Sequence, residues 1–484
     1  MKNTYIKISS LIVAGLLILS SCTTSLDINR DPDSLSPDQV PMNSQLPAAI
    51  TGIAASAGSY MAIVGGFWSQ FWTQSAVANQ YILIDDYTIP ASSAITNRAW
   101  SSMYDALTDI RNIKRIANED ENWNYYLIAT TLEVYASQLL VDTYGSIPYT
   151  EANDTSILTP KFESGEEVYD LMVADLKEAL SKNLALSPID NVPGTTDFLF
   201  QGDMDKWTQF ANSMLLKLYM RQTEVRPSVA SAGINELLNS GAQFLTMDAG
   251  IASNYFADEA SKSNPLYETD RRQLNVGTNL RASTTMGSFL DTNLDPRLAL
   301  FYDGTTFQDQ GDFDQGSSTA SVVILNPTTA VYLMSLAESK FLHAEALIRY
   351  KGGNGAEAVY NEGVMAAFDN WELDGTAMLA TAYAYPNGSM EDNIKAVITQ
   401  KWVASFPGNG YESFFEQNRT GYPEISSVPQ VDPAYVAGEF SYSIEGKTGG
   451  QFPKRLVFPQ EERQRNPNAP AASAVTDNVW YDIN

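Results

Sequence analysis

The sequence predicts a mainly α-helical protein, with a scaffold of helix pairs of the tetratricopeptide type, an irregular lobe and few short strands. Apolar residues recur at spacings of three and four over several segments, which is the period of an amphipathic helix. Segments rich in Gly, Pro and Asp separate these helices and let them fold back on one another as pairs. With 44% hydrophobic and 11% aromatic residues, the chain has ample material for a folded core.

The N-terminus has the layout of a secretory signal that ends at the single cysteine of the chain. Lys2 and Lys7 give a positive start, an apolar run covers 11–19, and small residues precede Cys22. This run is shorter than the ~20 residues that span a bilayer. The Leu-Ser-Ser-Cys ending resembles a bacterial lipobox, in which the cysteine becomes the lipidated first residue of the mature protein. The alternative is an ordinary signal peptide with an incidental cysteine.

Composition excludes several kinds of site and partner. The formal net charge is −27, so the protein repels nucleic acid and anionic lipid, and neither is an expected partner. A single cysteine excludes disulfides, zinc–thiolate sites and a cysteine nucleophile. His343 is the single histidine, and we expect no catalytic or metal-binding role for it, because no second His or Cys can join it. No other long apolar run exists, so no transmembrane helix is expected.

The domain organisation follows from these features. Residues 1–21 are the expected signal peptide, 22–47 a polar, proline-bearing arm, and 48–484 a single domain. Within that domain, small apolar residues at 48–59 predict a helix, which the glycines at 65–66 interrupt. Phe67, Trp68, Phe71 and Trp72 then follow at helical spacing, and the β-branched, acidic stretch 81–90 is expected to be an exposed loop or strand.

Helices dominate two parts of the domain, at 97–224 and 331–405. The apolar stripes predict helices at 97–118, 123–144, 165–182, 205–224, from 331 to the glycines at 352–353, at 355–368 and at 393–405. Residues 227–327 contain few convincing long helices, but their interleaved aromatic residues indicate an ordered, irregular lobe laid over the scaffold. From 422 onward no amphipathic helix is evident.

Several stretches, in their order along the chain, resemble one known family. They are LLVDTYGSIPYTEA at 139–152, EEVYDLMVADLKEAL at 166–180, WTQFANSMLLKLYMR at 207–221, DPRL at 295–298, AESKFLHAEA at 337–346, IKAVITQKWVASFPGNGYESFFEQNRTGYP at 394–423 and FPKRLVFPQEERQRNPN at 452–468. Behind a lipobox, this ordered set resembles the SusD/RagB family of outer-membrane nutrient-binding lipoproteins, and within it the SusD-like type 2 branch.

The resemblance implies four tetratricopeptide-like helix pairs with an irregular ligand-binding part. It implies a lipoprotein at the outer membrane, facing the cell exterior, that captures oligosaccharides and delivers them to a SusC-like TonB-dependent transporter, whose lid it forms. Some members bind peptides instead. It implies no enzymatic activity, and the sequence shows no nucleophile elbow, zinc-protease helix or phosphate loop. A surface glycoside hydrolase and a scaffold or adhesin that binds protein remain as alternatives.

Aromatic residues outside helical stripes are the candidates for sugar contact, because they combine a flat apolar face with a polar tip. Tyr81 and Tyr87 flank two aspartates in a predicted loop. Tyr255 and Tyr267 lie in the irregular lobe near Arg271 and Asn275, which could orient a polar ligand or simply hold the lobe together. Trp72 is a further candidate on a stripe that favours core packing. Trp207, Trp371 and Trp402 are interpreted as packing residues.

The stretch DQGDFDQG at 309–316 is similar to the start of a calcium loop. The calcium pattern requires a glutamate at its twelfth position, where counting from Asp309 gives Ala320 and counting from Asp312 gives Val323. The stretch is therefore interpreted as a solvated turn. A structural cation such as calcium is compatible with it, but no cofactor or metal is predicted.

Overall fold

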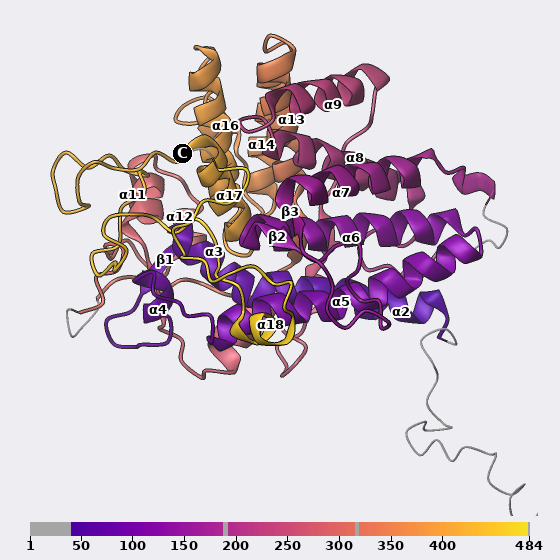
Figure 1. The fold of residues 1–484 in the computed structure, drawn as a ribbon. Coiled ribbons are helices and arrows are strands. Elements are labelled where there is room, and N and C mark those ends of the chain that lie inside the picture. The colour runs from indigo at the N-terminus through magenta and orange to yellow at the C-terminus, as the bar shows by residue number, and fades with distance from the viewer. Residues whose placement is uncertain (1–39, 187–191, 315–318, 483–484) are drawn as a thin grey trace, which may run out of the picture. The chain divides into compact units, whose positions relative to one another are not determined.

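The computed structural model describes residues 40–186, 192–314 and 319–482 (Figure 1). The chain divides into two compact units, Met1–Pro41 and Met42–Asn484, and nearly all of the first lies outside the described residues. The predicted signal peptide, Cys22 and most of the arm therefore fall outside the described residues.

The second unit is mainly α-helical, which confirms the predicted fold class. The α-helices are α2 (Met42–Ser56), α3 (Ala62–Trp68), α4 (Ile82–Asp85), α5 (Ala94–Glu119), α6 (Trp123–Tyr144), α7 (Gly165–Ser181), α8 (Met204–Arg221), α9 (Pro227–Ser240), α10 (Pro265–Tyr267), α11 (Thr284–Thr292), α12 (Leu298–Phe301), α13 (Leu336–Tyr350), α14 (Ala356–Asp369), α15 (Thr376–Leu379), α16 (Met390–Ala404), α17 (Gly410–Thr420) and α18 (Gln460–Arg465). The short 3₁₀ and π turns are η2 (Ala57–Met61), η3 (Leu184–Leu186), η4 (Gly194–Thr196), η5 (Ser253–Tyr255) and η6 (Glu268–Arg272). The strands are β1 (Trp72–Gln74), β2 (Ser146–Ile147), β3 (Glu163–Ser164), β4 (Ala249–Ile251), β5 (Leu280–Ala282) and β6 (Val331–Met334).

Helix α6 lies at the centre of the scaffold. It packs against α5, α7 and α8, and every residue from Asn124 to Tyr144 is buried. Its start is fixed by Asn122, whose side chain accepts a hydrogen bond from the Tyr125 amide. Helix α7 begins with a capping box between Ser164 and Glu167. These caps set where each helix begins, and the apolar stripes then pack the helices side by side.

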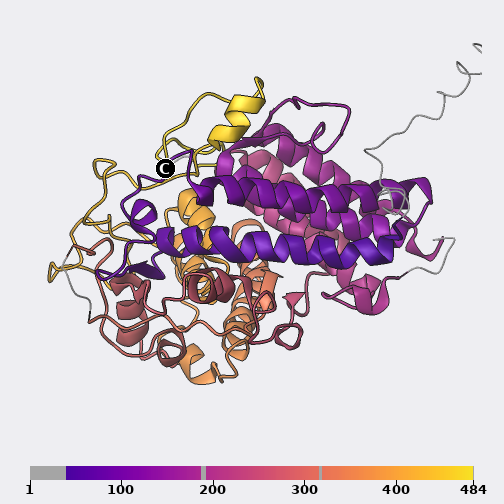
Figure 2. The same ribbon diagram turned by 90° about the horizontal axis from the view of Figure 1, so that it is seen from below.

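The first helical segment runs further than predicted at both ends, because α2 already begins at Met42, inside the predicted arm at 22–47. A π-helical turn, η2, joins α2 to α3, and the helix continues through the two glycines that were expected to interrupt it. These glycines serve close approach, because a Cβ on Gly65 would lie 2.1 Å from the Tyr411 backbone nitrogen of α17. Figure 2 shows α2 beside α5, against which it packs. Within the described residues, Met42–Trp68 is the one helical segment long and apolar enough to cross a membrane, but its most apolar window is 67% buried inside the protein, so it is a core helix.

Two other predicted boundaries are wrong. Residues 331–334 form strand β6, and the helix begins only at Leu336, after the N-cap Ser335. The irregular lobe contains a full helix, α9, which starts at Pro227, ends at Ser240 and is capped by Gly241 in the left-handed conformation (φ 72°). Helix α9 packs on α8, to which its buried Ala230 and Ile234 contribute.

The described residues contain three two-stranded antiparallel sheets, β1–β5, β2–β3 and β4–β6. Strand β1 pairs Trp72 with Ala282 of β5, and β4 pairs Gly250 with Tyr332 of β6. These short ladders tie the irregular lobe to the helical parts on either side of it. A second core cluster forms where α13, α14 and α16 pack together around Phe341, Tyr360 and Val397.

Candidate ligand-binding site

A cavity of about 490 Å³ lies where the irregular lobe meets the start of α13, the α14–α15 loop and the α16–α17 loop. This volume falls within the ~300–1,000 Å³ that is usual for small-molecule sites. The cavity is lined by Gly58, Ser253, Asn264, Leu266, Leu300, Ile324, Asn326, Pro327, Thr328, Thr329, Ala330, Val331, Tyr332, Ser335, Glu338, Asn370, Trp371, Glu372, Lys401, Ala404, Ser405, Phe406, Pro407, Gly408, Asn409 and Tyr411.

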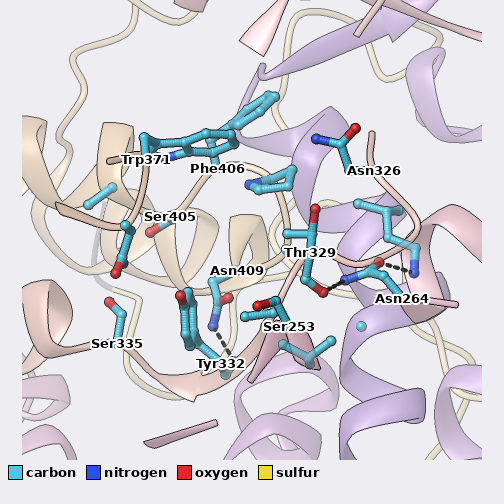
Figure 3. A pocket seen from close by; sticks show the side chains of 18 of the residues that line it. Ser253, Asn264, Asn326, Thr329, Tyr332, Ser335, Trp371, Ser405, Phe406 and Asn409 are labelled. Atoms are coloured by element: carbon cyan, nitrogen blue, oxygen red, sulfur yellow. Dashed lines mark hydrogen bonds between the residues drawn. The ribbon is translucent and has the colours of Figure 1, made fainter. Parts of the chain in front are cut away.

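Aromatic and polar side chains face one another across this cavity. Figure 3 shows Trp371 and Phe406 on one side, with Tyr332, Asn409 and Ser253 opposite them. Asn326 and Thr329 close a third side. A flat apolar wall therefore stands opposite groups that can form hydrogen bonds.

The turn after α14 places three consecutive lining residues, 370–372, at the rim. The Trp371 amide donates to the Phe368 carbonyl at 2.9 Å, and the Leu373 amide donates to the same carbonyl at 3.1 Å. Glu372 adopts a left-handed conformation (φ 56°), which costs a non-glycine residue about 1–2 kcal/mol. Such strained residues cluster at ligand sites.

Two aromatic residues present unused polar groups to the cavity. Trp371 is half-buried, and its indole N–H has no hydrogen-bond partner among the described residues. The Tyr332 hydroxyl likewise has none, and it stays protonated because burial and nearby Asp248 raise the pKa of Tyr332. Each ring thus offers an apolar face together with an open hydrogen-bond donor.

Two asparagines are fixed and two are free to bind. The Asn264 amide donates to the Thr329 carbonyl at 2.9 Å, and the Asn409 amide donates to the Tyr332 carbonyl at 3.0 Å. The side chains of Asn326 and Asn370 have no hydrogen-bond partner among the described residues. The fixed amides hold the wall in shape, and the free ones can both donate to and accept from a ligand.

The floor of the cavity is the edge of a buried ionic network. Lys401 of α16 and Glu338 of α13 line the cavity, and the N-cap Ser335 positions Glu338 by accepting from its amide at 3.1 Å. Glu338 Oε1 lies 2.7 Å from Lys217 Nζ of α8. Behind them the network continues through Asp142, Arg221, Glu345, Glu412, Glu416 and Arg419.

Burial and opposite charges act against each other on the pKa values of this network. Burial raises the pKa of Glu338. Burial also acts to raise the pKa of Glu412, but the attraction of Lys217 and Arg221 outweighs it, so that the pKa of Glu412 is lowered. Burial therefore prevails at Glu338, and opposite charges prevail at Glu412.

Three of the sequence-predicted ligand residues lie in the interior. Trp72 is fully buried in β1 and not on a helix. Tyr81 is 1% exposed against Phe67, and Tyr87 is 4% exposed between Tyr442 and Phe452. The expectation of an exposed loop at 81–90 is therefore wrong. The segment contains helix α4 and turns inward because Asp85 accepts hydrogen bonds from Thr73 and Gln74, while burial raises the pKa of Asp85 to about 6.

The four candidates in the lobe lie outside the cavity lining. Tyr255 is 40% exposed and packs on Phe198. Tyr267 packs beneath Arg272, whose guanidinium carbon lies 5.5 Å from the ring centroid. Arg271 pairs with Asp270 and donates to the Val323 carbonyl, so it holds the lobe together. Asn275 is exposed between two turns, with φ 52°.

We find no metal site at either of the two places considered in the sequence, His343 and the described part of the stretch at 309–316. Within 40–186, 192–314 and 319–482, no group of three or more His, Cys, Asp or Glu residues is arranged to hold a metal ion. His343 packs against Phe244, and burial lowers the pKa of His343 to about 4. Asp309 accepts a hydrogen bond from Thr284 at 2.6 Å, and residues 315–316 lie outside the described residues.

Trp371 is the functional candidate that sequence reasoning missed, since it was interpreted as a packing residue. The signal that could have found it is its position after the last apolar residue of the helix. There it stands between Asn370 and Glu372, shortly before Gly375. Trp207 and Trp402 are buried, as expected.

Comparisons with known proteins give one consistent result. The family model SusD-like_2, described as "Starch-binding associating with outer membrane", matches residues 37–458. A SusD homologue from Bacteroides uniformis shares 22% identity over 90% of this chain and 99% of its own, with a TM-score of 0.72. A chitin-binding SusD homologue from Flavobacterium johnsoniae shares 21% identity over 91% and 99%, also with a TM-score of 0.72. A SusD homologue from Bacteroides fragilis shares 19% identity over 92% and 100%, with a TM-score of 0.70.

No curated protein matches the sequence. The solved structures share the fold over nearly their whole lengths. The family model covers most of the chain, in agreement with the stretches that resemble SusD/RagB proteins. The chain therefore belongs to the SusD-like family, whose members are described as starch-binding and associating with the outer membrane.

Proposed function

We propose that this protein is a cell-surface lipoprotein that binds oligosaccharides in the cavity around Trp371. The observation that carries the proposal is the half-exposed indole of Trp371 opposite the unpartnered Tyr332 hydroxyl, with the free amides of Asn326 and Asn370 nearby. The family description and the chitin-binding homologue support it.

The chemistry of the cavity suits a sugar ring. A pyranose has apolar C–H faces that pack on an aromatic ring, and hydroxyl groups at its edge that need both donors and acceptors. Trp371 supplies the face, while Tyr332, Asn326 and Asn370 supply donors and acceptors that the described protein leaves unused. The same aromatic rings, amides and hydroxyls could also bind a peptide. The experiment must therefore distinguish a peptide ligand from a glycan.

Binding without hydrolysis is the activity that the cavity favours. A glycoside hydrolase requires a pair of carboxyl groups that reach the glycosidic bond. Glu338 is 5% exposed and engaged by Lys217, so it is a structural member of the ionic network. We therefore propose a binding protein and no enzyme.

The same proposal includes a membrane anchor and a transporter. Lipidation at Cys22 would tether the domain through the residues that precede α2, and the domain would act as a lid on a SusC-like TonB-dependent transporter. The family's association with the outer membrane supports this location.

Isothermal titration calorimetry with maltohexaose, cellohexaose, chitohexaose and a mixed tripeptide library tests the ligand class. We expect saturable binding of at least one glycan and no release of new reducing ends during a day of incubation. Binding of peptides alone would replace the glycan proposal, and steady release of reducing ends would show a hydrolase. Co-purification of the anchored protein with a large outer-membrane barrel tests the transporter.

A further inference from the structure

The charges around the cavity are distributed unevenly between floor and rim. Among the described residues that line it, the charged ones are Glu338, Glu372 and Lys401. The first and last belong to the floor. Glu372 stands at the rim, one residue beyond Trp371, on an exposed turn.

The positive charge of the floor is already balanced. The Lys401 ammonium lies 3.6 Å from Glu416 Oε1 and 4.0 Å from Glu338 Oε1, and its side chain is 2% exposed. Lys217, which faces the same carboxylates, lies 2.7 Å from Glu338 and 2.9 Å from Glu412. Lys401 Nζ has no hydrogen-bond partner among the described residues. Its charge is nevertheless compensated by the carboxylates of Glu338 and Glu416, so an anion in the cavity would meet no uncompensated positive charge.

The negative charge of the rim is not balanced. Glu372 is exposed and forms no ion pair with any described residue. The chain as a whole carries a formal charge of −27, which adds a repulsive field for anions. The remaining polar groups of the lining are hydroxyls and amides, which satisfy neutral hydrogen-bonding partners.

From this charge distribution we infer that the cavity selects neutral oligosaccharides and discriminates against glycans that carry carboxylate or sulfate groups. The inference rests on the proposed function and adds the chemical class of the ligand. An anionic sugar must lose part of its hydration to enter, and the one cation of the described lining, Lys401, already has its charge compensated by Glu338 and Glu416. Glu372 repels it in addition, and a like charge at contact distance near the surface weakens binding about tenfold or more.

The test compares neutral and acidic glycans of equal length on the full protein. Maltohexaose, cellohexaose and chitohexaose form the neutral arm, and hexagalacturonate and a chondroitin sulfate hexasaccharide form the anionic arm. Calorimetry at low salt should show at least one neutral ligand, with every anionic ligand about tenfold weaker or undetectable.

Charge reversal at the rim isolates the cause. In E372K the ratio of anionic to neutral affinity should rise about tenfold at low salt, and this gain should shrink at 0.5 M NaCl because salt screens exposed charges. In E372Q, which removes the charge without reversing it, this affinity ratio should rise less than in E372K. E461K makes the same change in charge on α18, outside the cavity lining, and should leave the ratio within about twofold of the unmodified protein, because distant exposed charges are screened.

The outcomes separate the inference from the proposed function. An acidic glycan that binds as tightly as the best neutral one, and that is lost in W371A, would overturn the charge selectivity while glycan binding stands. An affinity ratio that does not change in E372K would overturn the role of the rim charge. If no glycan of either class binds to the folded protein, the proposed function itself fails.

Discussion

The indole of Trp371 lies 4.9 Å from the ring of Phe301, centroid to centroid, at an interplanar angle of 55°. Phe301 is fully buried, whereas Trp371 is only half-buried. One part of the indole is therefore held by the core while another part borders the cavity. A ring fixed in this way loses little conformational freedom when a ligand packs on it.

Replacing Trp371 with alanine should abolish most of the glycan affinity. Loss of an aromatic anchor that the ligand buries costs about 2 kcal/mol of binding free energy, which raises the dissociation constant roughly 30-fold. W371F keeps an apolar face but loses the N–H, and should weaken binding about fivefold. Calorimetry measures both. W123A, a tryptophan outside the lining, should bind like the unmodified protein, and equal affinity in W371A would show that the ligand binds elsewhere.

Removing the guanidinium of Arg221 should destabilise the fold strongly. Arg221 Nε lies 3.0 Å from Asp142 Oδ2 and Nη2 lies 2.8 Å from Glu412 Oε2, with all three side chains buried. R221M leaves these carboxylates without their cation, which costs about 3–5 kcal/mol. Urea denaturation measures this loss. The exposed pair of Arg115 and Glu119 is the control, and R115M should cost less than about 0.5 kcal/mol. Similar losses in both variants would contradict this account of the network.

His343 should remain neutral down to acidic pH. Burial lowers its pKa to about 4 in the folded protein, against about 6.5 in the unfolded chain. The unfolded chain therefore binds the proton first, and native stability falls as the pH decreases from about 6.5 to about 4, by up to roughly 3 kcal/mol. In H343Q, the part of the pH dependence of stability that comes from His343 should be absent. Because His343 is the single histidine, its imidazole resonances identify it in an NMR titration, and a midpoint near 6.5 would refute the prediction.

Substituting Cys22 should release the protein from the membrane. If Cys22 carries the lipid, C22A yields a folded protein that no longer partitions with membranes and no longer incorporates labelled palmitate. Glycan affinity should be unchanged, because the cavity is built within the second unit. Membrane fractionation measures the outcome in cells without the transporter. A C22A protein that stays membrane-bound there would exclude the lipobox interpretation.

The sequence predicted those helices whose apolar residues form one stripe, such as α5, α7 and α8. Helix α17 was not predicted, because its buried face includes the charged residues Glu412, Glu416 and Arg419, which form ion pairs. Buried charges hide the apolar period on which the prediction depends. The ion pairs that allow these charges to be buried form between helices far apart in the sequence, so no local pattern predicts them.

The candidate site was harder to predict for the same reason. Tyr87 looked exposed because its neighbours are acidic, yet its packing partners Tyr442 and Phe452 lie more than 350 residues later in the chain. The cavity likewise draws on segments from Ser253 to Tyr411, together with Gly58. No local pattern could bring them together, although the position of Trp371 after a helix end was available.

The enclosure of α6 has a consequence for how such a protein can diversify. Because every residue of α6 from Asn124 to Tyr144 is buried, a substitution at any of these positions changes the packing of neighbouring side chains. The turn at 370–372 is different, because Asn370 and Glu372 stand at the rim of the cavity and Trp371 packs on the core with only one part of its ring. Under the proposed function, substitutions of a few rim residues can change the ligand preference, while tight packing constrains the sequence of the central helix.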